Sequence, residues 1–425
     1  MDIRITPTKL SGEIRAISSK SDVHRLLIAS ALAKGETKIT FTTLSDDIKA
    51  TMDVLCTMGA KIELSGNDGA YTATVCGIEE MPRGVTLDAN ECGTTARLIL
   101  PIAAALCDSF TLTGKNGLKK RPFAGLCGCM EQNGTACSDT FLPITTSGKL
   151  KSGTYKIRGD ISSQYISALL FALPLLDGDS EIVINNQISS IGYIAMTFRT
   201  LTLFGIIFER TNNGFLIKGN QQYRSCGAYT AEGDWSNAAF WLCGGAMGGD
   251  ITVTGLDITS FQPDCMLLNI LNRVCARIAN EENGGINTKK SILRNAALDG
   301  DSHPDLIPIV ATMLSLSIGD SRIYNAKRLR IKESDRIATT TAMLKALGAD
   351  IKATDDGFLI WGVDRFIGGE VDAANDHRIA MCAAIASQCA VGDVIIRGAE
   401  CVNKSYPTFF EDFKKLGGKF DVING

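Results

Sequence analysis

A short strand-like pattern recurs six times along the chain at intervals of about 70 residues, and it constrains the fold more than any other feature. Each copy alternates β-branched residues with others and is bounded by turn formers, as is typical of short strands. The six predicted strands are Thr37–Thr42, Ser109–Gly114, Ser180–Asn185, Asp250–Gly255, Asp320–Asn325 and Asp393–Gly398. Spacing that holds through six copies indicates a repeat architecture rather than chance periodicity.

An apolar helix of about four turns is predicted before each strand. The six helices are expected to begin near Ser21, Gly93, Ser163, Ser236, Pro304 and His377. A second helix is expected after each strand; examples are Ile48–Met58, Tyr193–Phe204 and Ile337–Leu347, each followed by a glycine. Because 425 residues exceed one ordinary compact core, we expect two α/β domains, each a closed arrangement of three repeats.

Composition excludes several classes of partner. The net charge is −3, so no basic surplus indicates nucleic acid, and 45% hydrophobic residues argue against disorder. No apolar run reaches the ~20 residues of a spanning helix, so no membrane association is expected. The 14 cysteines are scattered and form no zinc motif, so no metal site is expected. Many unpaired cysteines in a chain without an export signal predict a cytoplasmic protein.

The six predicted helix starts are polar, whereas the rest of each helix is apolar. A helix start carries about half a positive charge and several unpaired N–H groups, so anions bind there readily. If equivalent ends face one another, they form a positive cleft in a chain of slightly negative charge. The alternative is that Ser, Thr and Asp at these positions only cap the helices, a contribution of about 1 kcal/mol each.

Cations beside these starts favour the anion-binding interpretation. Lys20 and Arg378 oppose the helix dipole unless an anion lies between them. Three loops after the repeated strands carry further cations, namely Lys119–Arg121, Lys327–Arg336 and Asn403–Pro407. Arg binds carboxylate and phosphate through two parallel bonds, and Lys acts as a point charge. The expected ligands are therefore small, multiply anionic molecules.

Two acids lie among these cations. Asp305 heads the fifth apolar helix, and Glu333 lies between Lys332 and Arg336. Either carboxylate could act as a base, or Asp305 could simply complement the helix dipole and Glu333 form a surface ion pair. Motifs for nucleotide binding, zinc hydrolysis and serine esterase chemistry are absent from the sequence.

As a set, the motifs closely resemble the 5-enolpyruvylshikimate-3-phosphate synthase family of enolpyruvyl transferases, over nearly the whole chain. The motifs that carry this resemblance are Ser19–Ser21 with His24–Arg25, Gly93–Arg97, Arg121–Pro122, Gly159–Gln164, Lys332–Arg336, Asn375–Met381 and Lys404–Pro407. The resemblance implies an inside-out α/β barrel, with two domains of three βαβαββ repeats and an active site in the interdomain cleft. It places the first domain at 13–227 and the second at 1–12 with 228–425.

The resemblance also implies the reaction. The 5-hydroxyl of shikimate 3-phosphate attacks phosphoenolpyruvate, and the tetrahedral intermediate releases phosphate. The product belongs to chorismate and aromatic amino acid biosynthesis. No metal or organic cofactor is implied. The family is the target of glyphosate, and its members are usually monomers.

By motif match, three sets of residues are expected to form the site. The shikimate 3-phosphate set is Lys20, Ser21, Arg25, Ser162, Ser163, Gln164, Ser190, Asp305 and Lys332. The phosphoenolpyruvate set is Lys20, Gly93, Arg121, Gln164, Arg336, Arg378 and Lys404. The catalytic set is Asp305, Glu333 and Lys20, with the division of acid and base work left open.

Two positions depart from the family pattern, and two rival functions stay open. Arg328 and Glu91 stand where other members have Asn, so their roles are undecided. The nearest rival is the related enolpyruvyl transfer to UDP-N-acetylglucosamine, in which Cys127 or Cys129 could serve as a reactive loop cysteine. A rival of another class is a non-catalytic anion-binding protein, which would gain nothing from Asp305 and Glu333.

Overall fold

The chain folds into two compact units in the computed structural model, which describes residues 1–67 and 69–424. Unit 1 comprises Met1–Ser19 together with the chain from Glu232 onward, and unit 2 comprises Lys20–Ala231. Among the described residues, no helix combines the length and the apolar character needed to cross a bilayer.

Each unit contains three four-stranded sheets of identical topology, which confirms the predicted six repeats. In every sheet an edge strand pairs parallel with a central strand, and two antiparallel strands follow. The sheets of unit 2 are β14 (Ala228–Thr230), β3 (Glu36–Phe41), β5 (Ala70–Cys76) and β4 (Lys61–Asn67); β6 (Thr86–Asp88), β7 (Ser109–Thr113), β9 (Ile144–Ser147) and β8 (Ala136–Cys137); and β10 (Thr154–Arg158), β11 (Ser180–Asn185), β13 (Gly214–Ile217) and β12 (Phe208–Thr211).

The sheets of unit 1 repeat this order. They are β2 (Ser11–Arg15), β15 (Asp250–Thr254), β17 (Ile286–Lys289) and β16 (Arg277–Asn280); β18 (Ala297–Asp299), β19 (Asp320–Tyr324), β21 (Phe358–Trp361) and β20 (Asp350–Ala353); and β22 (Gly369–Asp372), β23 (Val394–Arg397), β1 (Asp2–Thr6) and β24 (Lys419–Asn424). The central strands β3, β7, β11, β15, β19 and β23 are the six strands predicted from the sequence.

Two edge strands determine where the chain passes between the units. β2 precedes the first repeat of unit 2 but pairs with β15 of unit 1, and β14 pairs with β3 of unit 2. The boundaries therefore fall after Ser19 and after Ala231. The predicted crossings near residues 12 and 228 lie earlier, because the sequence pattern does not reveal which central strand an edge strand will join.

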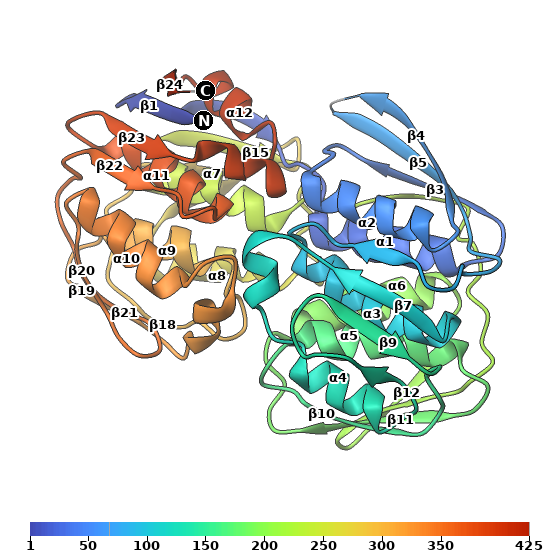
Figure 1. Cartoon of the computed structure of the whole chain (residues 1–425). Helices are drawn as coiled ribbons and strands as arrows, with labels where there is room; N and C mark the ends of the chain where they lie inside the picture. Colours follow the sequence, from blue (N-terminus) through green and yellow to red (C-terminus); the bar gives the residue numbers. More distant parts are fainter. Residues whose placement is uncertain (68, 425) are drawn as a thin grey trace. The chain divides into compact units, whose positions relative to one another are not determined.

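Six buried helices form the interior of the two units. They are α1 (Lys20–Leu32), α3 (Gly93–Leu106) and α5 (Ser163–Ala172) in unit 2, and α7 (Trp235–Met247), α9 (Ile307–Leu314) and α11 (His377–Ala386) in unit 1. Every residue of α9 and α11 is buried, as expected for helices that are apolar on all sides. Within each unit the sheets lie outside these helices (Figure 1).

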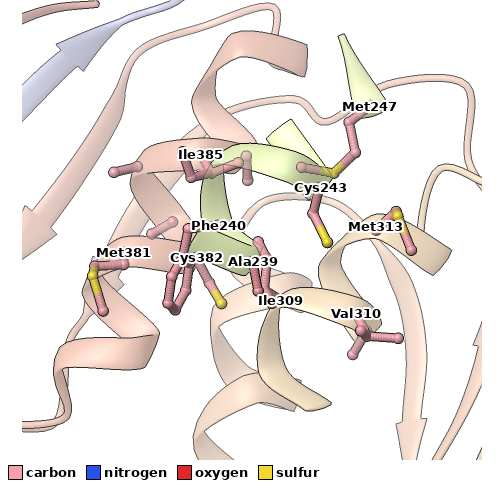
Figure 2. Close-up of a cluster of buried hydrophobic side chains, with 14 of the residues drawn as sticks. Ala239, Phe240, Cys243, Met247, Ile309, Val310, Met313, Met381, Cys382 and Ile385 are labelled. Carbon is pink, nitrogen blue, oxygen red and sulfur yellow. The ribbon is translucent and has the colours of Figure 1, made fainter. Parts of the chain in front are cut away.

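The core of unit 1 shows how these helices pack. Side chains from α7, α9 and α11 meet in one cluster that includes Phe240, Cys243, Ile309, Met313 and Cys382 (Figure 2). Small residues such as Ala239 alternate with large ones along the helices, so the cluster fills without polar atoms. The packed helices hold their polar starts in fixed positions, and the predicted functional residues lie at those starts.

A second helix follows the central strand in every repeat, as predicted. These helices are α2 (Asp46–Thr57), α4 (Ala124–Glu131), α6 (Ile191–Leu203), α8 (Leu267–Arg273), α10 (Arg336–Ala346) and α12 (Phe409–Lys415). Three of them, α4, α8 and α12, have only 8, 7 and 7 residues. Helices of two turns carry weak periodicity, so the sequence alone did not define their bounds.

Candidate active site

In unit 2 the first helix start places Lys20 beside a carboxylate. The Lys20 Nζ lies 2.7 Å from the Asp47 Oδ2, and both side chains are mostly shielded from solvent. Asp47 belongs to the first turn of α2, where the helix dipole also favours a negative charge. The ion pair therefore fixes the Lys20 ammonium at the start of α1.

Arg25 joins two of the predicted helix starts. Its guanidinium is buried and donates to Ser21 O at 2.7 Å, Tyr193 O at 3.0 Å and Thr197 Oγ1 at 2.9 Å. Burial lowers the pKa of Arg25 to about 10, so the side chain stays charged at neutral pH. The contacts link the start of α1 to α6, the helix that follows Ser190.

The starts of α3 and α5 come together around Arg121. A Cβ on Gly93 would lie 2.7 Å from Arg121 Nη1 and 3.1 Å from Arg97 Nη1. Arg97 in turn donates to Gln164 Oε1 at 2.7 Å, and Gln164 Nε2 donates to Thr94 Oγ1 at 2.9 Å. Three residues of the predicted phosphoenolpyruvate set therefore lie close to Arg97: Gly93 and Arg121 at the start of α3, and Gln164, which is hydrogen bonded to Arg97.

The serines at the remaining starts of unit 2 differ in geometry. Ser162 Oγ accepts from Gln164 N at 3.3 Å, so this serine caps α5, as the alternative interpretation expected. Ser163 is buried in the first turn. Ser190 precedes α6 with a φ of 55°, in the left-handed region that non-glycine residues seldom occupy. Backbone in that region is often found at functional sites.

In unit 1 the side chain of Arg336 lies at the centre of a cluster of three acids. Its Nε donates to Asp376 Oδ2 at 2.8 Å, its Nη1 to Asp305 Oδ1 at 2.7 Å and its Nη2 to Glu333 Oε2 at 2.5 Å. Arg336 and Asp376 are fully buried. The structure therefore places Glu333 in a partly buried ion pair, and an incoming anion would compete with Glu333 and Asp305 for the guanidinium.

Asp305 is surrounded by cations. Burial alone would raise its pKa, but Arg378, Lys332 and Arg336 hold the pKa well below its usual range. Lys332 Nζ lies 3.5 Å from Asp305 Oδ1, and burial lowers the pKa of Lys332 to about 8. Asp305 is therefore ionised in the absence of substrate. An anion that neutralised these cations would raise its pKa and make it a better base.

The position of Asp305 corrects one expectation. The predicted helix start near Pro304 is early, because α9 begins at Ile307 and Leu306 occupies the N-cap. Asp305 lies in the preceding turn, in which Leu306 N donates to His303 O. Leu306 rather than Asp305 therefore occupies the N-cap position, and the Asp305 carboxylate pairs with Arg336.

Arg378 connects Asp305 to a carboxyl group that the sequence did not single out. Its Nη1 donates to Asp305 O at 3.0 Å, and its Nη2 donates to Ser236 Oγ at 2.7 Å. Ser236 also hydrogen bonds with Asp264, which is buried in a 3₁₀ helix. Burial first and then the charge of Asp305 raise the pKa of Asp264 to about 7, against the opposing effects of Arg378 and Ser236.

The three basic loops occupy corresponding places in their repeats, as predicted. They form 3₁₀ helices after β7, β19 and β23, at Asn116–Lys120, Lys327–Ile331 and Ala399–Lys404. Lys404 Nζ donates to Asn375 O at 2.8 Å, directly before the start of α11. The third basic loop therefore contacts the same helix start that carries Arg378.

The two positions that depart from the family pattern both have partners. Glu91 Oε1 accepts from Asn116 Nδ2 at 2.7 Å, which ties it to the first basic loop. Arg328 Nη1 lies 3.6 Å from Asp301 Oδ1. The first contact is a hydrogen bond from a neutral amide and the second is an ion pair, and neither assigns the residue a role with substrate.

Sequence reasoning did not name the carboxylates Asp47, Asp264 and Asp376 as site residues, and it marked Ser236 only as a helix start. Asp376 could have been found, because it stands between Asn375 and His377 in a motif already singled out and lies at the N-cap of α11. Asp264 gave no such signal. Its 3₁₀ helix reaches Ser236 only through the packing of the fourth repeat.

Taken together, the fold and these clusters define an α/β enzyme whose buried helices begin at paired cations and carboxylates, suited to small, multiply charged anions. The EPSP synthase (3-phosphoshikimate 1-carboxyvinyltransferase) family profile matches residues 5–413. The chain belongs to this family.

Relatives and solved structures agree with that assignment. A 3-phosphoshikimate 1-carboxyvinyltransferase of Clostridium beijerinckii is 42% identical over 434 residues, which cover 100% of this chain and 99% of the relative. One from Clostridium perfringens is 40% identical, with 97% and 98% covered. The EPSP synthase structure of Acinetobacter baumannii matches with a TM-score of 0.81 at 25% identity, covering 99% of this chain and 100% of that one.

Proposed function

We propose that this chain transfers the enolpyruvyl group of phosphoenolpyruvate to the 5-hydroxyl of shikimate 3-phosphate, with residues of both units serving the one reaction. The family assignment and the similarity to named 3-phosphoshikimate 1-carboxyvinyltransferases support the overall transfer. The assignment of individual residues rests on their positions in the two clusters described above.

In the proposed division of work, unit 2 supplies Lys20, Ser21, Arg25, Ser162, Ser163, Gln164 and Ser190 toward shikimate 3-phosphate. Gly93 and Arg121 serve phosphoenolpyruvate, and Gln164 and Lys20 serve both substrates. In unit 1, Arg336, Arg378 and Lys404 serve phosphoenolpyruvate and Lys332 serves shikimate 3-phosphate. Fixed donors stabilise developing charge more than mobile water can, because they need no reorganisation during the reaction.

Asp305 is the proposed base for the 5-hydroxyl. The oxygen attacks C2 of the enol phosphate as Asp305 takes its proton, and C3 gains a proton from an acid that we assign to Glu333 or Lys20. The tetrahedral intermediate then loses a proton from C3 to the group that donated it, breaks its bond to the phosphate oxygen and regenerates the double bond with release of phosphate. The cations around Asp305 support this role, since their neutralisation by the two anionic substrates raises its pKa when it must accept a proton.

The single observation that carries the proposal is the placement of Asp305 between Arg336 and Arg378. A purely anion-binding protein would lose affinity from a carboxylate in that position. A carboxylate in that position can accept a proton from a bound hydroxyl. The serines and Lys332 favour a phosphorylated small acceptor.

One assay tests the activity against both rivals. Phosphate release from phosphoenolpyruvate is measured with shikimate 3-phosphate, with UDP-N-acetylglucosamine and with neither. We expect release only with shikimate 3-phosphate. Release with UDP-N-acetylglucosamine but not with shikimate 3-phosphate would support the related transferase. No release with either acceptor would support a binding protein.

We further propose that the protein acts as a monomer in the cytoplasm. None of the cysteines in the described ranges forms a disulfide, which suits a reducing compartment. Gel filtration with light scattering would measure the mass, for which we expect the 45.4 kDa of one chain.

A further inference from the structure

Three side chains with metal-binding atoms converge in unit 2, although the sequence separates them widely. They are His24 on α1, Asp47 on α2 and Cys92 at the N-cap of α3. One ligand atom of each lies within 4.8 Å of the others. His24 and Cys92 are fully buried, and none of the three is among the proposed substrate-binding or catalytic residues, although Asp47 holds Lys20.

The imidazole of His24 is oriented as metal-binding histidines usually are. Its Nδ1 is 2.7 Å from Thr51 Oγ1, which is itself 2.6 Å from Thr95 Oγ1. A hydrogen bond at one ring nitrogen fixes the ring and directs the other nitrogen to the ligand. Here the other nitrogen, Nε2, faces Cys92.

The spacing of His24 and Cys92 is close to that of a metal site. His24 Nε2 lies 3.8 Å from Cys92 Sγ. In a tetrahedral zinc site, ordinary bond lengths place a histidine nitrogen and a cysteine sulfur roughly 3.5 Å apart. Little movement of either side chain is therefore needed to bring both within bonding distance of one ion.

The protonation states also suit a metal that displaces one proton. Burial first, and then Lys20 and Arg25, lower the pKa of His24 well below its usual value, so the ring is neutral. Burial and the charge of Asp47 raise the pKa of Cys92 to about 12, against smaller effects of Lys20 and Thr95. The thiol proton is then the single proton lost when the metal–sulfur bond forms.

We propose that His24 Nε2, Cys92 Sγ and the Asp47 carboxylate bind one soft divalent cation of the zinc class. The Cys92 thiol releases its proton to solvent as the metal–sulfur bond forms. The Asp47 carboxylate turns from Lys20 to the metal. Because the reaction proposed above needs Lys20 in place, metal binding inhibits the enzyme, and this consequence alone rests on the proposed function.

The direct test is a titration of the purified, metal-free protein with Co²⁺ under anaerobic conditions. Co²⁺ replaces Zn²⁺ and reports its ligands, since a thiolate ligand gives a near-ultraviolet charge-transfer band and tetrahedral geometry gives intense visible bands. We expect both signals to saturate at one equivalent, and Zn²⁺ to abolish them. Absence of the charge-transfer band in the wild-type protein would overturn the proposal.

Matched variants locate the site. Cys92→Ser keeps an oxygen that can cap Thr95 N, and Cys107→Ser alters another buried cysteine, directly after the same helix. We expect Co²⁺ affinity to fall at least 100-fold in Cys92→Ser and to stay unchanged in Cys107→Ser. His24→Gln provides the same test if Cys92→Ser fails to fold by circular dichroism. Equal affinity in the wild-type protein and the tested site variant would refute the assignment.

The pH dependence adds a readout that does not depend on activity. Because a thiol must lose its proton when the metal–sulfur bond forms, the Co²⁺ affinity should rise as pH rises. A flat dependence would mean that no thiol proton is released and would contradict the site. A separate assay of phosphate release with added Zn²⁺ then tests whether movement of Asp47 away from Lys20 inhibits the enzyme.

Discussion

At the scale of single residues, a comparison of Arg336 and Arg378 distinguishes a contribution to stability from a contribution to activity. Both are buried and both contact Asp305, but Arg336 also neutralises the fully buried Asp376. Removal of one partner of a buried pair typically costs 3–5 kcal/mol, because the other charge is left uncompensated. Arg336→Ala should therefore lose stability by about that amount as well as activity.

Arg378→Ala is the cleaner test of phosphoenolpyruvate binding. We expect kcat/KM for phosphoenolpyruvate to fall by about 10²–10³, the usual effect of losing one fixed donor to developing charge. Urea unfolding of the two variants supplies the control. Activity near that of the wild-type protein would remove Arg378 from the site.

Asp264 should make stability depend on pH in a recognisable way. Its native pKa of about 7 lies above its ordinary value near 4, so the folded protein holds a proton that the unfolded chain releases between these pH values. The free energy of unfolding that Asp264 contributes therefore falls as pH rises from its ordinary pKa to its native pKa. Asp264→Asn should remove the dependence.

The measurement compares the free energy of unfolding of wild-type protein and Asp264→Asn at pH 5 and pH 7.5. From pH 5 to pH 7.5 the free energy of unfolding of Asp264→Asn should rise relative to that of the wild-type protein, by on the order of a few kcal/mol. Other titrating groups cancel in this comparison. Parallel curves for the two proteins would mean that Asp264 is ionised throughout.

At the scale of elements, the start of α3 explains why a glycine stands at position 93. A methyl group there would meet Arg121 Nη1 at 2.7 Å and Arg97 Nη1 at 3.1 Å, both at flexible ends of side chains. Gly93→Ala should therefore leave the fold intact but displace the Arg121 guanidinium. We expect a higher KM for phosphoenolpyruvate and a larger shift in the inhibition constant of its mimic glyphosate.

Steady-state kinetics with glyphosate as inhibitor checks this prediction, and thermal unfolding checks the fold. Unchanged inhibition would place Gly93 away from the smaller substrate. A fall in melting temperature of many degrees would instead show that the arginines cannot move.

The elements also show how far sequence reasoning reached. The six central strands and the six buried helices were predicted, since β-branched alternation and long apolar runs are strong signals. The early start predicted for α9 came from treating Pro304 as a first helical residue, whereas the His303–Leu306 turn precedes the helix. The partners of Asp305 could not be predicted, because they depend on the packing of three separate repeats.

At the scale of the whole molecule, the pairing of β2 and β14 determines which residues each unit needs in order to fold. β2 joins β15 in unit 1, and β14 joins β3 in unit 2. β14 covers the edge of β3 in unit 2 although it lies at the end of that unit's sequence. An uncovered central strand would expose unpaired backbone groups and invite association. A fragment of residues 20–231 should therefore unfold cooperatively, and a fragment of residues 20–225 should not.

Urea unfolding followed by circular dichroism distinguishes the two fragments, with light scattering to detect association. Identical transitions would show that β14 contributes nothing to unit 2. The resemblance placed residues 1–12 with the second domain, but the partners of β2 and β14 lay beyond sequence analysis because alternation identifies a strand but not its neighbour.

The central claim is that cations at helix starts of both units serve one enolpyruvyl transfer. The most direct measurement is kcat/KM for phosphate release from phosphoenolpyruvate with shikimate 3-phosphate, in Arg121→Ala of unit 2 and Arg378→Ala of unit 1. The account predicts a loss of about 10²–10³ in each variant, with the fold retained. Wild-type rates in either one would contradict it.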